Sequence, residues 1–295
     1  MNNTSRVIDV MIAGAQKSGT TSLADYLGQH PQIATHKQLE MTFFVNHEEY
    51  QLSYQNIFNN YFSADSINTE VVMGKSVGIM YFETAMQRLY EHNPECKIIV
   101  ILRDPVPRAY SAYWYMRRVG YETVDTFAQS LELESHRKAQ QGLESIHCLY
   151  RDRGIYHRQI RNLHELFGPK NVYILLLEDL KLNRHSVFPS LLSFIGVDES
   201  SPIEAKSRSN QAKLAKSEFL SKALKSDGSV KYLLKKLFPS TYLRTARNYI
   251  QRMNEAAFEI PEMEQSVKSE LTDFFRPHNR ELEKIIDRTL THWGT

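Results

Sequence analysis

The chain has 295 residues, of which 42% are hydrophobic and 24% charged, and its formal net charge at pH 7 is +2. This is ordinary globular composition with enough apolar residues for a substantial core. The small net charge excludes a general attraction of the whole chain to polyanions, but it does not exclude a local basic cleft. No basic stripe or recognised module predicts nucleic-acid binding.

Three features of the sequence bear on the cellular compartment: the N-terminus, the apolar runs and the cysteines. No apolar run reaches the roughly 18 residues that a transmembrane helix needs. The run at residues 7–13 is short, contains Asp9 and lacks a cleavage pattern, so we expect no signal peptide. Cys96 and Cys148 show no metal or redox spacing, which predicts plain thiols in a reducing compartment. These features favour a cytoplasmic location.

Strand-like and helix-like segments alternate along much of the chain. Buried strands are predicted at 7–13, 71–73, 97–102 and 172–177, and helices at 20–29, 84–92, 105–118, 123–140, 155–167 and from about 185 onward. Residues 198–232 are rich in Ser and Lys and predict either a mobile loop over a site or a surface connection. The tail at 271–290 predicts a pair of packing helices separated by Pro277.

Wholly apolar strands separated by helices predict an α/β fold with a central parallel sheet covered on both faces. We expect a single domain over residues 1–295, with a core at about 7–200 and a helical C-terminal part at about 201–295. Ligands of such sheets bind at the carboxyl ends of the strands. Functional residues are therefore sought directly after each strand.

The first such position is the loop at residues 14–22, between a strand and a helix. The backbone donors of this loop and the N-terminus of the helix behind it form an anion site. Its glycines have the separation of a Walker P-loop, but Thr20 stands where that motif has lysine, and the lysine is Lys17. The alternative is a tight strand-to-helix turn capped by Ser18 or Thr20.

Residues 16–23, Gln-Lys-Ser-Gly-Thr-Thr-Ser-Leu, resemble the 5′-phosphosulfate-binding loop of sulfotransferases that use 3′-phosphoadenosine 5′-phosphosulfate (PAPS). The resemblance implies a P-loop-like three-layer α/β fold. It also implies that Lys17 stabilises charge on the bridging oxygen as the sulfonate leaves. The cofactor-binding residues implied in this loop are Gln16, Lys17, Ser18, Gly19, Thr20, Thr21 and Ser22.

A second anion site is predicted after the strand at 97–102. Arg103 ends that strand, Asp104 is a natural helix cap, and Pro105 is well placed at the first helical position. A guanidinium fork and the Ser111 hydroxyl suit a phosphate dianion. The segment resembles the 3′-phosphate-binding element of the same family, with Arg103 and Ser111 in that role. The alternative is that Arg103 pairs with Asp104 or another neighbouring carboxylate.

Transfer also needs a base for the acceptor's proton. Residues 36–44 resemble the Lys-Glu-x-x-Phe-Phe stretch of the heparan-sulfate-type branch, in which the glutamate is the proposed base; here it is Glu40. Lys75 follows a strand and matches a lysine of that branch that faces the reacting group. Glu40 as a surface or ion-paired carboxylate is the alternative. His36 and His47 are further candidates for the base.

The region around the acceptor departs from that branch at two residue positions, and the spacing from Lys75 to Tyr81 and Phe82 is longer than in the branch. The lysine expected just before the glutamate is displaced to Lys37, and Gly74 replaces the family's glutamate before Lys75. The histidine base of the cytosolic branch is absent, because Ser76 and Val77 follow Lys75.

Residues 153–156, Arg-Gly-Ile-Tyr, resemble the third shared region of the family, and Tyr156 is predicted to bind the cofactor. The Lys-Gly-Arg-like loop that often closes over the adenine is missing. Arg208, within residues 207–211 and near Lys213 and Lys216, is its best substitute. A solvated charged linker is the alternative for this segment.

Together these features predict metal-free transfer of sulfonate from PAPS to a hydroxyl or amine of a small-molecule or sugar-like acceptor, with release of 3′-phosphoadenosine 5′-phosphate (PAP). Lys17, Glu40 and Lys75 are the predicted catalytic residues. A cytoplasmic enzyme that tailors a bacterial natural product fits these features best. We expect no nucleic-acid or membrane partner, and the sequence is compatible with a homodimer. The alternatives are a magnesium-dependent P-loop nucleotide kinase or phosphotransferase and a non-catalytic nucleotide-binding protein.

Overall fold

The structure is a computed structural model that describes residues 6–140, 146–201, 213–215, 255–257 and 260–294. The strands are β1 Val10–Gly14, β2 Ile33–Thr35, β3 Val71–Lys75, β4 Lys97–Leu102, β5 Val172–Leu176, β6 Lys213–Ala215 and β7 Glu255–Ala257. The α-helices are α1 Thr20–Leu27, α2 His47–Tyr50, α3 Tyr54–Tyr61, α4 Glu83–His92, α5 Pro105–Val119, α6 Phe127–Glu132, α7 Glu134–Gln140, α9 Tyr156–Phe167, α10 Leu177–Leu182, α11 Arg184–Ile195 and α15 Gln265–Ile286. Short 3₁₀ helices are η1 Ala64–Asn68, η2 Asp152–Gly154, η3 Pro169–Asn171 and η4 Thr291–Trp293.

The chain divides into two compact units. Unit 1 comprises Met1–Arg108, Arg153–Arg208 and Leu271–Thr295, and unit 2 comprises Ala109–Asp152 and Ser209–Glu270. None of the helices in the described ranges is long and apolar enough to cross a membrane.

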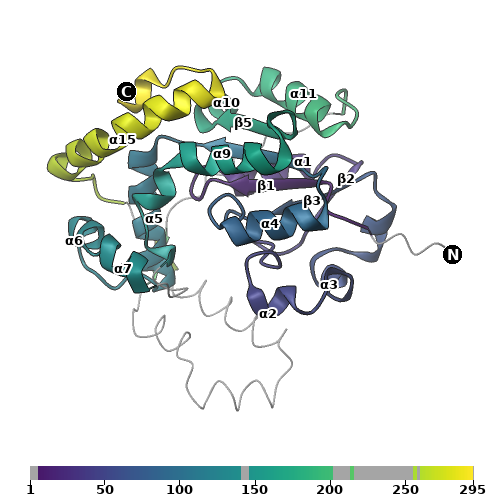
Figure 1. The fold of residues 1–295 in the computed structure, drawn as a ribbon, viewed down its shortest axis with the longest axis horizontal. Helices are drawn as coiled ribbons and strands as arrows, with labels where there is room; N and C mark the ends of the chain where they lie inside the picture. Colours follow the sequence, from purple (N-terminus) through teal and green to yellow (C-terminus); the bar gives the residue numbers. More distant parts are fainter. Residues whose placement is uncertain (1–5, 141–145, 202–212, 216–254, 258–259, 295) are drawn as a thin grey trace, which may run out of the picture. The chain divides into compact units, whose positions relative to one another are not determined.

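Unit 1 is built on a five-stranded sheet with the order β2-β3-β1-β4-β5 (Figure 1). Every neighbouring pair of strands in this sheet is parallel. The predicted parallel sheet is therefore confirmed. The sequence did not predict β2, because a three-residue strand is too short to show a pattern.

Alternate residues of each strand pack into two separate cores, one on each face of the sheet. In β4, Ile98, Val100 and Leu102 pack into the core that α4 and α9 cover, whereas Ile99 and Ile101 pack into the core that α1 and α11 cover. Because successive side chains of a strand point to opposite faces, strands that are buried on both faces must be apolar throughout. Figure 1 shows these helices around the sheet, and the predicted three-layer α/β fold is confirmed.

The tail of the chain corrects one prediction. α15 is a single helix of 22 residues that contains Pro277, so the predicted helix pair broken at this proline is wrong. Proline inside a helix removes one hydrogen bond and costs about 3 kcal/mol. The buried side chains of Leu271, Phe275 and Leu282 recur at helical spacing along this helix, and their burial outweighs that cost.

Unit 2 is organised around a buried carboxylate on the segment that follows α5. The side chain of Glu122 is fully buried and accepts two hydrogen bonds from Arg137, at 2.7 and 2.8 Å, and one from the Tyr150 hydroxyl at 2.8 Å. These partners hold the pKa of Glu122 below its usual value against the opposing effect of burial. An antiparallel pair, β6 and β7, also belongs to this unit.

Candidate active site

Three neighbouring strands end at the same edge of the sheet in unit 1. β1 lies between β3 and β4, with Ile12 beside both Lys75 and Ile99. The segments that leave this edge are the loop after β1, the Ser76–Phe82 segment after β3, and Arg103 after β4. The sheet therefore brings together three of the sequence segments that carry the predicted chemistry.

The loop after β1 has the backbone of an anion-binding turn. Lys17 and Gly19 adopt left-handed conformations, with φ of 66° and 91°. Gly19 is the N-cap residue of α1, and neither Ser18 nor Thr20 caps the helix through its side chain. A left-handed conformation costs a non-glycine residue about 1–2 kcal/mol and is concentrated at functional sites. The side-chain cap of the alternative interpretation is therefore missing from this helix, and the anion cradle stays a prediction.

Arg103 links this loop to the end of β4. Its Nη1 donates a hydrogen bond of 3.2 Å to the carbonyl oxygen of Lys17. The Tyr156 hydroxyl, at the start of α9, donates to the carbonyl oxygen of Arg103 at 2.9 Å. Burial lowers the pKa of the Arg103 guanidinium, which nonetheless stays protonated. The structure thus joins Lys17, Arg103 and Tyr156 in one hydrogen-bonded chain.

Asp104 caps α5 as predicted, since its carboxylate accepts a hydrogen bond of 2.9 Å from the Val106 backbone N–H. Ser111 lies on α5 in unit 2, which is described separately from the loop in unit 1. Arg208 lies outside the described residues. The cofactor-binding roles of Ser111 and Arg208 therefore remain predictions.

The sequence reasoning assigned no role to Arg108, which is fully buried in the first turns of α5. Burial raises the pKa of the neighbouring Tyr156 to about 12, and the charge of Arg108 acts in the opposite direction. Arginine is rarely buried without a partner, so this residue belongs to the polar interior behind the edge of the sheet. Its position one helical turn after the Asp104 cap, in the segment that follows β4, is the sequence signal that could have found it.

Glu40 and Lys75 form an ion pair at the end of β3. The Nζ atom of Lys75 lies 2.6 Å from Oε1 of Glu40 and also donates to the carbonyl oxygen of Leu39. Oε2 of Glu40 accepts the Val77 backbone N–H at 2.9 Å. The Lys75 side chain is only 5% exposed, compared with 29% for Glu40. The structure therefore brings these two predicted catalytic residues into contact, and it also contains the ion pair of the alternative interpretation.

The two histidines considered as bases differ in their surroundings. Nε2 of His36 accepts a hydrogen bond of 2.9 Å from the backbone N–H of Lys75. Burial and, to a smaller extent, the charge of Lys75 lower the pKa of His36 to about 4. His47 begins α2, and its Nδ1 lies 3.1 Å from a guanidinium nitrogen of Arg88. Neither imidazole is thus an unengaged base beside Glu40.

The donors at this edge match a ligand with two phosphate groups. The open N-terminus of α1 and the loop hydroxyls suit one anionic group, and the Arg103 guanidinium suits a second. Gly19 itself is needed for the turn, because its φ is 91° and a Cβ at this position would lie 3.0 Å from Cδ1 of Leu177. The residues present therefore fit the predicted nucleotide.

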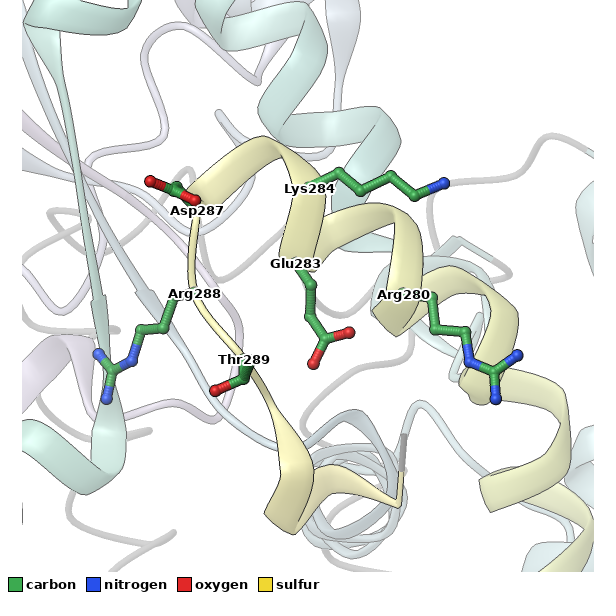
Figure 2. Close-up of a pocket in the computed structure, with 6 residues that line it drawn as sticks. All are labelled: Arg280, Glu283, Lys284, Asp287, Arg288 and Thr289. Atoms are coloured by element: carbon green, nitrogen blue, oxygen red, sulfur yellow. The ribbon is translucent and has the colours of Figure 1, made fainter.

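An open pocket lies elsewhere in unit 1, at the end of α15 (Figure 2). It is lined by Arg280, Glu283, Lys284, Asp287, Arg288 and Thr289. Arg288 pairs with Asp179 of α10 and Lys284 pairs with Glu281, while Glu283 accepts the Leu290 backbone N–H at 2.5 Å. In Figure 2, Arg280 and Lys284 point away from the other side chains. The pocket presents no converging set of donors comparable to that at the edge of the sheet.

Comparison with known proteins assigns the chain to a family. The family described as "Sulfotransferase domain" matches residues 8–272. The chain is 26% identical over 196 residues to human bifunctional heparan sulfate N-deacetylase/N-sulfotransferase 3, and 25% identical over 287 residues to the mouse protein of that name. These matches cover 65% and 96% of this chain, but only 22% and 30% of the relatives.

A solved structure supports the same assignment. The sulfotransferase from Alicyclobacillus acidocaldarius superposes with a TM-score of 0.71 at 25% identity, over 98% of this chain and the whole of that one. It shares the central parallel sheet and flanking helices that the sequence predicted. With a match that extends over most of its length, this chain belongs to the sulfotransferase domain family.

Proposed function

We propose that the chain transfers sulfonate from PAPS to a hydroxyl or amine of its acceptor and releases PAP. The observation that carries the proposal is the arrangement at the edge of the sheet. The Arg103 guanidinium donates to the carbonyl oxygen of Lys17 there, and Lys75, which pairs with Glu40, ends the adjacent strand β3. A carboxylate and two lysines next to an anion cradle provide what metal-free group transfer requires.

Each residue has a distinct role in this proposal. PAPS supplies the activated sulfonate. The loop N–H groups and the hydroxyls of residues 18–22 hold the 5′ phosphate, and Lys17 balances the charge that develops on the bridging oxygen. Arg103 binds the 3′-phosphate, together with Ser111 and Arg208. Glu40 accepts the proton of the acceptor, and Lys75 holds the Glu40 carboxylate and faces the transferred group.

The kinase alternative is not favoured. The chain has Thr20 where a P-loop kinase has its lysine, and its family is that of sulfotransferases. The presence of both Lys17 and Glu40, whose carboxylate is held by Lys75 Nζ and the Val77 N–H, argues against a non-catalytic nucleotide-binding protein.

The acceptor is proposed at the level of chemical class. Relatives named as heparan sulfate N-sulfotransferases support a sugar-like acceptor with an amine or hydroxyl group. We propose a small-molecule or carbohydrate-like acceptor, and a cytoplasmic enzyme of natural-product tailoring in which a single sulfotransferase domain spans residues 1–295. Homodimerisation belongs to the same proposal and is tested by the mass of the protein in solution.

Donor binding is the first test. Calorimetric titration of metal-free protein with PAP, ATP and AMP should show preferential binding of PAP. Arg103→Ala should weaken PAP binding by tenfold or more, because a charge-assisted contact to phosphate is worth about 1.5–3 kcal/mol. Arg161→Ala, which removes an exposed arginine of α9, is the matched control and should bind PAP normally.

Transfer is the second test. Protein incubated with ³⁵S-labelled PAPS should label de-N-sulfated heparin or an amine- or hydroxyl-bearing small molecule from a screen, and Lys17→Ala and Glu40→Gln should abolish labelling. Equal or tighter binding of ATP that depends on magnesium would overturn the proposal in favour of a kinase. PAP binding without transfer to any acceptor would favour the non-catalytic alternative.

A further inference from the structure

Lys75 is held at every polar atom that it presents. Its side chain donates to Glu40 and to the Leu39 carbonyl oxygen. Its own carbonyl oxygen accepts the Met41 backbone N–H at 2.8 Å. The remaining backbone group, the Lys75 N–H, lies at the last residue of β3, and it donates to the side chain of His36.

His36 takes the place of a backbone partner at this point. β2 pairs with β3 only from Ile33 to Thr35, with Thr35 beside Met73. Because β2 ends one residue before His36, no strand carbonyl is in register for the Lys75 N–H. The imidazole Nε2 accepts it instead at 2.9 Å. An imidazole that accepts through Nε2 is neutral and carries its proton on Nδ1.

We propose that His36 is a positioning residue for the reaction, whose neutral imidazole holds the end of β3 so that Lys75 meets Glu40. The effect of His36 on the reaction rests on the proposed function, whereas the hydrogen bond between His36 and Lys75 can be tested without it. Its engaged lone pair makes His36 unsuited to act as the base, and it acts on the acceptor only through Lys75 and Glu40.

The surroundings of His36 maintain the required state. Tyr61 and Phe62 both pack edge-on against its ring, with centroids at 6.1 and 6.2 Å. Both of these residues are themselves buried. An apolar, aromatic environment disfavours the charged imidazolium, and the nearby Lys75 ammonium opposes a second positive charge. The hydrogen bond to Lys75 is therefore retained at neutral pH.

His92 offers a matched control in the same unit. Its Nε2 accepts the Ile8 backbone N–H at 3.0 Å, and its ring packs against Phe44 and Tyr54. Burial lowers its pKa to about 4, as it does for His36. His92 therefore has the same kind of hydrogen bond in a similar environment, but its backbone partner, Ile8, lies before β1 and not at the carboxyl edge.

The test uses full-length protein labelled with ¹⁵N at histidine and lysine. Long-range ¹H–¹⁵N spectra at pH 7 should show His36 as the neutral tautomer protonated on Nδ1. The Lys75 ammonium signal, assigned by its loss in Lys75→Arg, should shift in His36→Phe and return in His36→Gln, whose side-chain oxygen can accept the same hydrogen bond. Exchange of the Lys75 amide should be about tenfold faster in His36→Phe than in His92→Phe.

The possible results separate the inference from the proposed function. PAP affinity measured on wild type tests the donor site, and it should be unchanged in His36→Phe because the loop after β1 is not involved. The positioning role is wrong if His92→Phe shifts the Lys75 signals as much as His36→Phe does, or if His36→Gln fails to restore them. This conclusion does not depend on the measured PAP affinity. If the spectra behave as expected while PAP fails to bind wild type, the geometry stands and the proposed function falls.

Discussion

At the scale of single residues, the Glu40–Lys75 pair is asymmetric. The Lys75 side chain is 5% exposed and Glu40 is 29% exposed, so the lysine depends on its partner more than the carboxylate does. Removing one member of a buried pair leaves an uncompensated charge, which is the costly outcome. The order of two stability changes follows from this difference.

Glu40→Ala should lower the free energy of unfolding by about 3 kcal/mol, because it strands the buried Lys75 ammonium. Lys75→Met should cost distinctly less, since the remaining carboxylate still accepts the Val77 N–H and reaches water. Urea denaturation of both variants measures the difference. A larger loss for Lys75→Met than for Glu40→Ala would show that the pair is solvated and that Lys75 needs no partner.

The buried histidines predict how stability responds to acid. His36 and His92 have folded-state pKa values of about 4, below the 6.5 of an unfolded histidine. The unfolded chain therefore binds more protons between these values, so stability falls as the pH drops from about 6.5 to about 4 and is fully present above 6.5. Burial also lowers the pKa values of His157, His164 and His278, which contribute in the same direction.

We expect the double variant His36→Gln, His92→Gln to flatten the loss of stability between pH 6.5 and 4, because glutamine does not titrate. Thermal unfolding followed by circular dichroism across this range measures the slope. The exposed His136→Gln, on α7, is the control and should leave the slope unchanged. An unaltered slope in the double variant would mean that both imidazoles titrate normally in the folded protein.

At this scale the sequence predicted the chemistry but not the contacts. Roles were predicted for Lys17, Arg103, Glu40 and Lys75 because each residue follows a strand or matches a family motif. The contacts between these residues could not be predicted, because the Arg103–Lys17 hydrogen bond, for example, depends on β1 and β4 being neighbours in the sheet. The role of His36 was equally hidden, because it depends on where β2 stops pairing with β3.

At the scale of elements, the start of α9 supports the end of β4. The Tyr156 side chain is buried, and its hydroxyl donates to the carbonyl oxygen of Arg103. The sequence predicts that Tyr156 binds the cofactor, and in the structure its hydroxyl contacts the backbone of Arg103, the residue predicted to bind the 3′-phosphate. Its influence on a bound nucleotide should therefore pass through Arg103.

Tyr156→Phe should weaken PAP binding several-fold, because losing one hydrogen bond of about 1 kcal/mol loosens the Arg103 backbone. Calorimetric titration measures this effect. Tyr90→Phe, on α4, keeps the ring that packs against Phe167 and serves as the control. Unchanged PAP affinity in Tyr156→Phe would show that the strand alone positions Arg103.

Element boundaries show where sequence patterns are informative. The strand β4 and the helix α5 begin where Lys97 and the Asp104 cap predicted, because apolar runs and caps are local signals. The continuity of α15 through Pro277 was mispredicted, because its buried residues gain their energy from packing that a local pattern does not contain. Local rules thus predicted the elements around the site better than those at the end of the chain.

At the scale of the whole molecule, unit 1 is assembled from three separate stretches of chain. The last stretch supplies Leu282, Leu290 and Trp293 to the same core as Tyr156, and the Trp293 ring lies 6.2 Å from that of Tyr156. The parallel sheet likewise joins strands that are distant in sequence. Periodicity in the sequence cannot predict such non-local contacts. The fold class could therefore be predicted from the sequence, but the division into two units could not.

The two tryptophans report on the two units separately. Trp293 lies in the core of unit 1, and Trp114 lies in unit 2, where its ring packs against Tyr110 and Tyr113. The chain has no other tryptophan. In Trp114→Phe all tryptophan fluorescence therefore comes from unit 1, which holds Lys17 and Arg103.

PAP at a hundredfold excess over its dissociation constant stabilises the state that binds it by about 2.7 kcal/mol. We therefore expect the thermal midpoint of Trp114→Phe, followed by tryptophan fluorescence, to rise by roughly 5 °C or more with PAP. AMP at the same concentration should raise it less, because it lacks the 3′-phosphate that Arg103 binds. The complementary variant Trp293→Phe reports on unit 2 and tests Ser111. A matching rise there, reduced by Ser111→Ala, would support its role in binding the 3′-phosphate, whereas no rise would confine the donor site to unit 1.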